Sequence, residues 1–242
     1  MDDNALPSGE ILLECERLWV FAVLTAAGGF LGAYTYTLRG GVFCNAQTAN
    51  LVMLSMALGN GNWGRAAYYL LPMGAYILGT VLSELLPTRV RRFHFLRWDS
   101  LLVGLEVLVT LLLGFIPESW PYQLCQLSIN FICSMQYNTF RQAEHIPMAT
   151  TFCTNHIRQL GIFLSKWLSR GSDPALRRRI FGHLLMLFAF SAGAAASAIA
   201  CRFFNGRAIW GASALLLIVF IDLAHADRTK EKGLLELKPS GH

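Results

Sequence analysis

The stretch Arg39–Leu58 holds the densest group of side chains that could bind a small solute. Four of them donate and accept hydrogen bonds without carrying charge: Asn45, Gln47, Thr48 and Asn50. Such groups suit a neutral or zwitterionic solute, or an ion that loses its water. A structural role is equally open, because a segment that enters a membrane without crossing it needs hydrogen-bond partners for its own backbone.

A second polar segment, Met148–Trp167, repeats parts of the first. Residues 47–51 align with residues 153–157, and the remaining matches follow in the same order along the chain. The other aligned pairs are Arg39 with Arg141, Arg65 with Arg179, and Gly79 with Gly193. The second segment adds three candidates for solute binding: Thr154, Asn155 and His156.

One expected helix, residues 122–140, has a polar face. Its polar residues recur every fourth position: Gln126, Asn130, Ser134 and Asn138. Residues spaced in this way lie on one side of a helix. Asn130 is therefore a further candidate for contact with a solute.

Three charged residues are candidates for ion binding or ion coupling. Glu106 lies well inside an apolar run, where an ionisable group is costly and marks a functional site by default. It could also lie near enough to the interface to reach water or a basic neighbour. Arg39 and Arg141 could bind an anion, although interfacial arginines that extend to the membrane surface need no further role, and we favour that interpretation.

No established metal or catalytic motif is present. Cys153 and His156 could share a helical face as metal ligands, or as a thiolate and its base, but two ligands are fewer than a closed site needs. The six cysteines form no CxxC pair, and no nucleophile elbow, HExxH motif or phosphate-binding loop occurs. We expect neither a metal nor a cofactor.

Composition places these residues in a membrane protein. Hydrophobic side chains make up 54% of the 242 residues, charged ones only 14%, and the mean hydropathy is +0.44. The net charge of +5 does not indicate nucleic acid, because the basic residues flank apolar runs, where they orient a membrane protein. We predict an all-α bundle with about six membrane spans: 18–38, 66–86, 100–116, 122–140, 180–203 and 208–224.

The basic loops predict how this bundle is oriented. The cluster around Arg89–Arg97 should be cytoplasmic, which places both termini, a leader (1–17) and a mobile tail (226–242), inside. The two halves, 18–118 and 119–225, would each contain three spans. An odd number of spans gives the second half the opposite orientation, so we predict an inverted repeat with two re-entrant or broken-helix segments. If the first polar segment crosses the membrane, the N-terminus moves outside.

The motif in residues 39–50, the glycine-rich span before it and the weaker copy at 150–161 resemble the YoaK-like family of bacterial inner-membrane proteins. The resemblance covers about residues 18–224. In this family Gly usually separates Thr from Asn in the Asn-x-Gln-Thr-x-Asn motif, whereas Ala49 stands here, and Asn155-His156 replaces Gly-Asn in the second copy. The resemblance implies a multi-pass location in the inner membrane and no particular activity.

These observations favour a small secondary transporter or channel-like permease for a small polar or anionic solute. The alternative is a non-transporting membrane module that binds a partner or lipid, and an intramembrane enzyme ranks third. The expected partners are the lipid bilayer and a solute, with a homodimer possible through small-residue helix faces.

Overall fold

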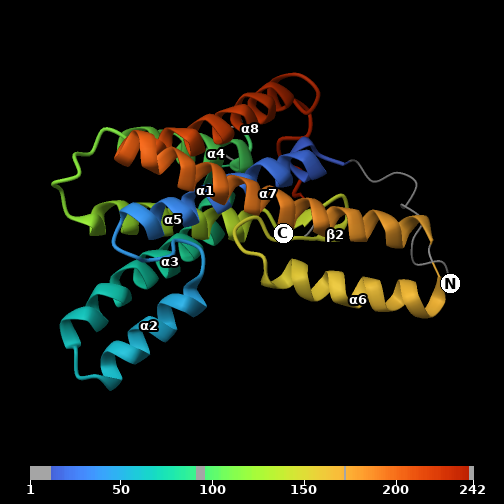
Figure 1. Cartoon of the computed structure of the whole chain (residues 1–242). Helices are drawn as coiled ribbons and strands as arrows, with labels where there is room; N and C mark the ends of the chain where they lie inside the picture. Colours follow the sequence, from blue (N-terminus) through green and yellow to red (C-terminus); the bar gives the residue numbers. More distant parts are fainter. Residues whose placement is uncertain (1–11, 91–95, 172, 240–242) are drawn as a thin grey trace.

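The protein is all-α in this computed structural model, which describes residues 12–90, 96–171 and 173–239 (Figure 1). The α-helices are α1 (Leu18–Leu38), α2 (Gln47–Gly59), α3 (Trp63–Val90), α4 (Trp98–Leu113), α5 (Tyr122–Thr139), α6 (Thr154–Arg170), α7 (Pro174–Phe204) and α8 (Trp210–Arg228). Short 3-10 helices occupy Glu14–Glu16 (η1) and Asn205–Ile209 (η3), and a hairpin pairs β1 (Gln142–Ala143) with β2 (Ile146–Pro147).

Each of the six apolar runs contains a helix, but their ability to cross a membrane differs. Within the described residues, three stretches have the length and hydropathy of a membrane span: Leu18–Leu38, Trp63–Val90 and Pro174–Arg228, the last comprising α7, η3 and α8. Helix α4 has 16 residues, and α5 has the polar face expected from its sequence. The apolar helices could therefore span a membrane, while a count of six spans remains a prediction.

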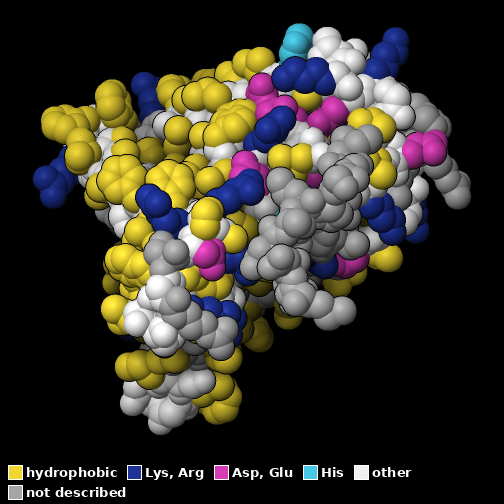
Figure 2. Space-filling model, turned by 90° about the vertical axis from the view of Figure 1, so that its right-hand side faces the viewer, with side chains coloured by type: hydrophobic (Ala, Val, Ile, Leu, Met, Phe, Trp, Pro, Cys, Tyr) yellow, Lys and Arg dark blue, Asp and Glu magenta, His cyan; other side chains and the backbone are white. Residues whose placement is uncertain are grey.

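The surface of the molecule agrees with an apolar environment. Figure 2 shows hydrophobic side chains over much of the left side of one face, with acidic side chains gathered at the upper right. Large apolar residues are exposed on both long helices, including Ile77 and Leu78 on α3 and Phe188 and Phe203 on α7. Apolar surface of this extent on a water-soluble monomer would be unusual.

Each of the two polar segments consists of a non-helical linker followed by a helix. Linker 39–46 leads into α2, and linker 140–153, which includes the hairpin, leads into α6. Helix α2 packs on α3 and α6 packs on α7. Helices α2 and α6 project from different sides of the bundle (Figure 1). Both segments therefore interrupt the bundle with non-helical chain.

Glycine permits the closest helix contacts. Helix α1 packs mainly on α7 and α3 packs mainly on α5. A Cβ atom at Gly193 of α7 would overlap the carbonyl oxygen of Ala26 in α1, and one at Gly79 of α3 would overlap that of Phe131 in α5. Only glycine allows backbones to approach this closely in an apolar medium.

A buried ionic cluster ties the chain ends to α4. The guanidinium of Arg97 lies 3.1 Å from Asp99 and 3.5 Å from Glu231, and the Asp227 carboxylate accepts hydrogen bonds from Arg97 N and Ser100 Oγ. Asp227 and Glu231 are both buried. The expectation of a mobile tail is thus wrong for this part of it. The neighbouring residues 91–95 of the basic loop, and residues 1–11 of the leader, lie outside the described residues.

The glycine contacts predict that Gly→Ala substitution lowers stability at one glycine and raises it at another. Gly193→Ala should lower the free energy of unfolding by roughly 1–3 kcal/mol, because α1 and α7 must move apart. Gly74→Ala is the matched control in α3, since a Cβ there meets nothing within 4 Å, and it should stabilise by about 0.5–1 kcal/mol. Thermal unfolding in detergent measures both changes, and equal effects would contradict the close α1–α7 contact.

Candidate functional site

The first linker is held by the amide of Asn50. Asn50 Nδ2 donates to the carbonyl oxygen of Phe43 at 2.7 Å, and Phe43 N donates to Asn50 Oδ1 at 3.2 Å. Asn50 is buried, and its Nδ2 also lies 3.2 Å from Gln47 Oε1. Gln47 Nε2 then donates to Asn130 Oδ1 at 2.8 Å, which connects the segment to α5. These three predicted site residues therefore form one connected network.

His156 holds the second linker in the same way. Its Nε2 lies 2.8 Å from the carbonyl oxygen of Ala149, seven residues earlier, and the Asn50–Phe43 pair has the same separation. Because that oxygen only accepts, Nε2 carries the proton and Nδ1 accepts from His183 Nδ1 at 2.8 Å. Both rings are buried, and burial lowers the pKa of His156. His156 is neutral at pH 7.

Both linkers meet helix α1 at its glycines. Asn45 Nδ2 donates to Gly28 O at 3.0 Å, and a Cβ atom at Gly32 would lie 2.9 Å from the same nitrogen. The second linker approaches the same helix: a Cβ atom at Gly28 would lie 2.6 Å from the carbonyl oxygen of Thr150. The Gly28-x-x-x-Gly32 face thus provides space for non-helical chain.

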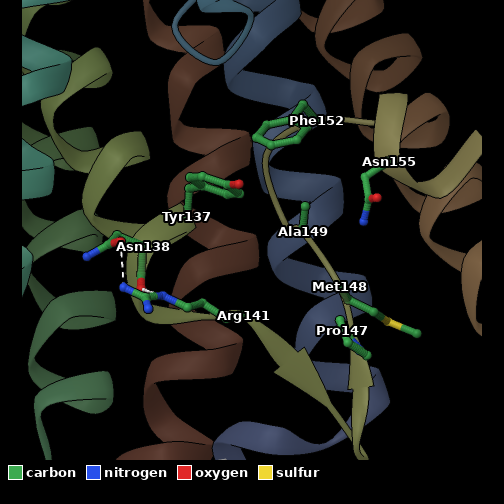
Figure 3. A pocket seen from close by; sticks show the side chains of 8 residues that line it. All are labelled: Tyr137, Asn138, Arg141, Pro147, Met148, Ala149, Phe152 and Asn155. Carbon is green, nitrogen blue, oxygen red and sulfur yellow. Dashed lines mark hydrogen bonds between the residues drawn. The ribbon is translucent and has the colours of Figure 1, made fainter. Parts of the chain in front are cut away.

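A polar cavity of about 420 Å³ lies where the second linker faces the end of α5. Figure 3 shows Tyr137, Asn138 and Arg141 on one side and Ala149, Phe152 and Asn155 on the other. Pro147 and Met148 complete the lining. This volume accommodates a small solute, and amides, a phenol and a guanidinium give it hydrogen-bonding groups.

Arg141 is held at the cavity wall by its neighbours. Its Nε donates to the carbonyl oxygen of Asn138 at 2.6 Å and its Nη2 donates to Asn138 Oδ1 at 2.7 Å. The same nitrogen pairs with Glu84 of α3. The guanidinium is partly exposed, as an interfacial arginine would be. Arg141 is part of the cavity lining, and its guanidinium turns toward Asn138 (Figure 3).

Arg39 lies away from the cavity, and its burial contradicts the expectation of an interfacial side chain. Its Nε and Nη2 donate to Tyr34 Oη at 3.0 and 2.7 Å, and Tyr34 donates to Gly206 O at 2.9 Å. Arg39 is 1% exposed. The phenol of Tyr34, which is itself bonded to Gly206, holds the guanidinium at the junction of α1 with η3. Thr48 and Thr154 are both exposed at the starts of their helices and join neither network.

Comparison with known sequences gives a family. The DUF1275 profile, described as a protein of unknown function, matches residues 20–221. The chain belongs to this family. No curated protein and no solved structure matches the chain. This membership agrees with the resemblance to an uncharacterised family that the motifs indicated. The YoaK-like name itself is not confirmed. The family description gives no activity.

Glu106 is isolated among the described residues of this DUF1275 member. It is 1% exposed on α4, and neither carboxylate oxygen has a hydrogen-bond partner there. An unpaired carboxylate in such a place costs much more than a neutral acid. Proximity to water or to a basic neighbour, the simpler alternative, finds no support in this arrangement.

The Cys153–His156 pair does not form a catalytic or metal-binding cluster with Glu106 in the described structure. His156 uses both ring nitrogens for Ala149 and His183, while Cys153 is half-buried. No group of three or more metal-ligating side chains occurs among the residues described. The enzyme hypothesis that required these three residues therefore loses its geometric basis.

Sequence reasoning missed several residues of the site. His183 lies within an apolar helix with no motif around it, and Tyr137 lines the cavity although it belongs to neither copy of the repeated motif. Phe152 lies in the weaker copy but was not among the candidate residues. The hydroxyls of Thr150 and Thr151 are buried without a hydrogen-bond partner in the described chain. The pair of threonines in the weaker copy of the motif was the available signal.

The histidine pair predicts that acid destabilises the protein. As the pH falls from about 7.5 to about 5.5, the unfolded chain takes up a proton that buried His156 resists, so stability decreases through this range. His156→Asn, which places the amide of the first half at the aligned position, should reduce this loss. Thermal unfolding at both pH values measures the effect; an equal loss in the variant would remove His156 as its source.

The unpaired carboxylate of Glu106 predicts that an apolar replacement stabilises the protein. Glu106→Leu should raise the free energy of unfolding by roughly 1–3 kcal/mol, because it removes a buried polar group that has no partner. Asp99→Leu is the comparison, since Asp99 is buried on the same helix but pairs with Arg97, and it should destabilise. Unfolding in detergent distinguishes the two signs, and a destabilised Glu106→Leu protein would imply a partner for this carboxylate.

Proposed function

We propose that this protein is a small-solute permease of the bacterial inner membrane, with the 420 Å³ cavity as the entrance to its binding site. The cavity carries this proposal because it joins a solvent-accessible space to the second of two polar linkers. Uncharged amides and a guanidinium suit a small polar or anionic solute. The solute would enter between the end of α5 and the start of α6.

The closed centre supports a transporter more than an open pore. The amides there bond to one another or to backbone of α1, α5 and the first linker: Asn45, Gln47, Asn50 and Asn130. A solute could exchange hydrogen bonds with these amides as it passes, since each amide offers both donors and an acceptor. The competing membrane module would use the packed centre only for stability and the cavity only for binding, so solute flux distinguishes it from a permease.

The contacts also support an inverted repeat. Helix α1 packs on α7 as its counterpart α5 packs on α3, and α2 packs on α3 as α6 packs on α7. Gly79 and Gly193, which align in the sequence, make the close contacts in these equivalent pairs. Asn50 and His156, also aligned, hold equivalent linkers. We propose six spans, with both termini in the cytoplasm and the cavity open to that side.

Glu106 is the proposed coupling residue. A carboxylic acid buried among apolar helices can bind and release a proton when a conformational change admits water. Its helix packs against α5 and α8, so a movement between the halves would alter its surroundings. We therefore propose that proton binding at Glu106 is coupled to movement of the solute.

A flux measurement tests the proposal. Proteoliposomes are challenged with acetate, nitrate, glycine and glycerol, and swelling is followed by light scattering. At least one solute should enter faster than into empty liposomes, and Arg141→Gln should slow entry of an anion roughly tenfold by removing a charge from the cavity wall. Arg178→Gln is the matched control, because Arg178 is similarly exposed and pairs with Glu144 outside the cavity lining. Equal slowing by both variants would contradict a role for the cavity.

A further inference from the structure

One pair of equivalent positions in the two linkers carries side chains of very different size. The carbonyl of Phe43 accepts a hydrogen bond from Asn50, and the carbonyl of Ala149 accepts one from His156, in each case from a residue seven positions later. Phe43 and Ala149 therefore occupy matching positions in the two halves. The methyl group of Ala149 lines the cavity. In the first half the matching residue, Phe43, carries a partly buried benzyl group in place of this methyl group.

The ring of Phe43 stacks on Tyr36, in the last turn of α1. The two centroids are 4.5 Å apart and the planes differ by 17°. In the second half the last turn of α5 contributes Tyr137 and Asn138 to the cavity wall. Each half thus places the end of its first helix against its own linker, and the space between them is filled in one half and empty in the other.

The linker residues that follow Phe43 are buried. The next residues of the linker, Cys44 and Asn45, are buried, and so is Asn50. Tyr36 is 48% exposed and Phe43 is partly buried, so the stack lies at the surface, next in the chain to these buried residues. Side-chain rotation of partly exposed rings is fast, so such a stack can open without unfolding the helices around it.

We infer that the Tyr36–Phe43 stack closes a second solute vestibule, the counterpart of the cavity in the other half and open to the opposite side of the membrane when Phe43 turns away. This inference rests on the proposed permease function. The vestibule would take the same small polar or anionic solute and bring it to the amides of Asn45 and Asn50. The cavity and this vestibule would then be the two entrances to one path.

The test measures access of water-soluble reagent to Cys44, with no solute involved. Cys44 is kept as the only cysteine, and membrane vesicles of known orientation are treated with a membrane-impermeant cationic methanethiosulfonate. Phe43→Ala should increase the rate of modification roughly tenfold, because a buried thiol reacts only when it is exposed. Phe115→Ala is the matched control: Phe115 is an exposed ring that packs on Trp210, away from the linker, and its removal should leave the rate unchanged.

A reciprocal change tests the equivalence. With Asn155→Cys as the only cysteine, Ala149→Phe should fill the cavity and slow modification roughly tenfold, whereas Ala149→Ser should not. The two reporters should react from opposite sides of the vesicle. Tyr36→Ala provides a second way to open the stack if the Phe43 variant does not fold.

The outcomes separate this inference from the proposed function. Unchanged reactivity of Cys44 in folded Phe43→Ala and Tyr36→Ala proteins would overturn the second vestibule, and so would modification of both reporters from the same side. Faster reactivity from the opposite side supports it even if no tested solute crosses. If solute flux is observed but the rate of Cys44 modification is unchanged in these variants, the permease proposal stands and the second vestibule is overturned.

Discussion

The constraint on which this structure depends is the hydrogen bonding of backbone that is buried outside a helix. A linker inside an apolar bundle leaves amide and carbonyl groups without water, and each unpaired group is costly. Asn50 satisfies both backbone groups of Phe43, and His156 satisfies the carbonyl of Ala149. Without such side chains, the linkers would have to become helical or leave the bundle. The polar motifs are therefore needed first for the fold, and any solute site uses groups already held in place.

The same constraint explains why helix α1 is rich in glycine. A linker can approach a helix closely only where no side chain intervenes, and Gly28 and Gly32 face the two linkers. The neighbouring glycine, Gly29, contacts the backbone of α7 at Phe190. One short stretch of α1 thus faces both linkers and a helix of the other half. Close packing of this kind transmits displacement, because a dense interior deforms little before it rearranges.

The helices could be predicted closely from the sequence, because long apolar runs bounded by Gly, Pro and charge leave few alternatives. Span 18–38 coincides with α1, and span 122–140 differs from α5 by one residue. The amide motif could be recognised as a buried network, yet its partners could not, since Asn130 is 83 residues from Gln47. The cavity depends on contacts between the end of α5 and a distant linker, which periodicity does not report. Arg39 follows a span, as interfacial arginines do, and only the fold brings Tyr34 and η3 around it.

The two halves use the same geometry with different chemistry. Asn50 holds its linker with an amide that does not titrate, whereas His156 uses a ring whose second nitrogen depends on a proton from His183. If His156 Nδ1 were protonated, it would face the N–H of His183 and the contact between α6 and α7 would weaken. Arg179, which lies over Phe163 beside this pair, opposes further positive charge there. The half with the cavity therefore carries a proton-sensitive link, and the other half carries the Tyr36–Phe43 stack. The helix framework is common to both halves, so they differ in the side chains that hold and line their linkers.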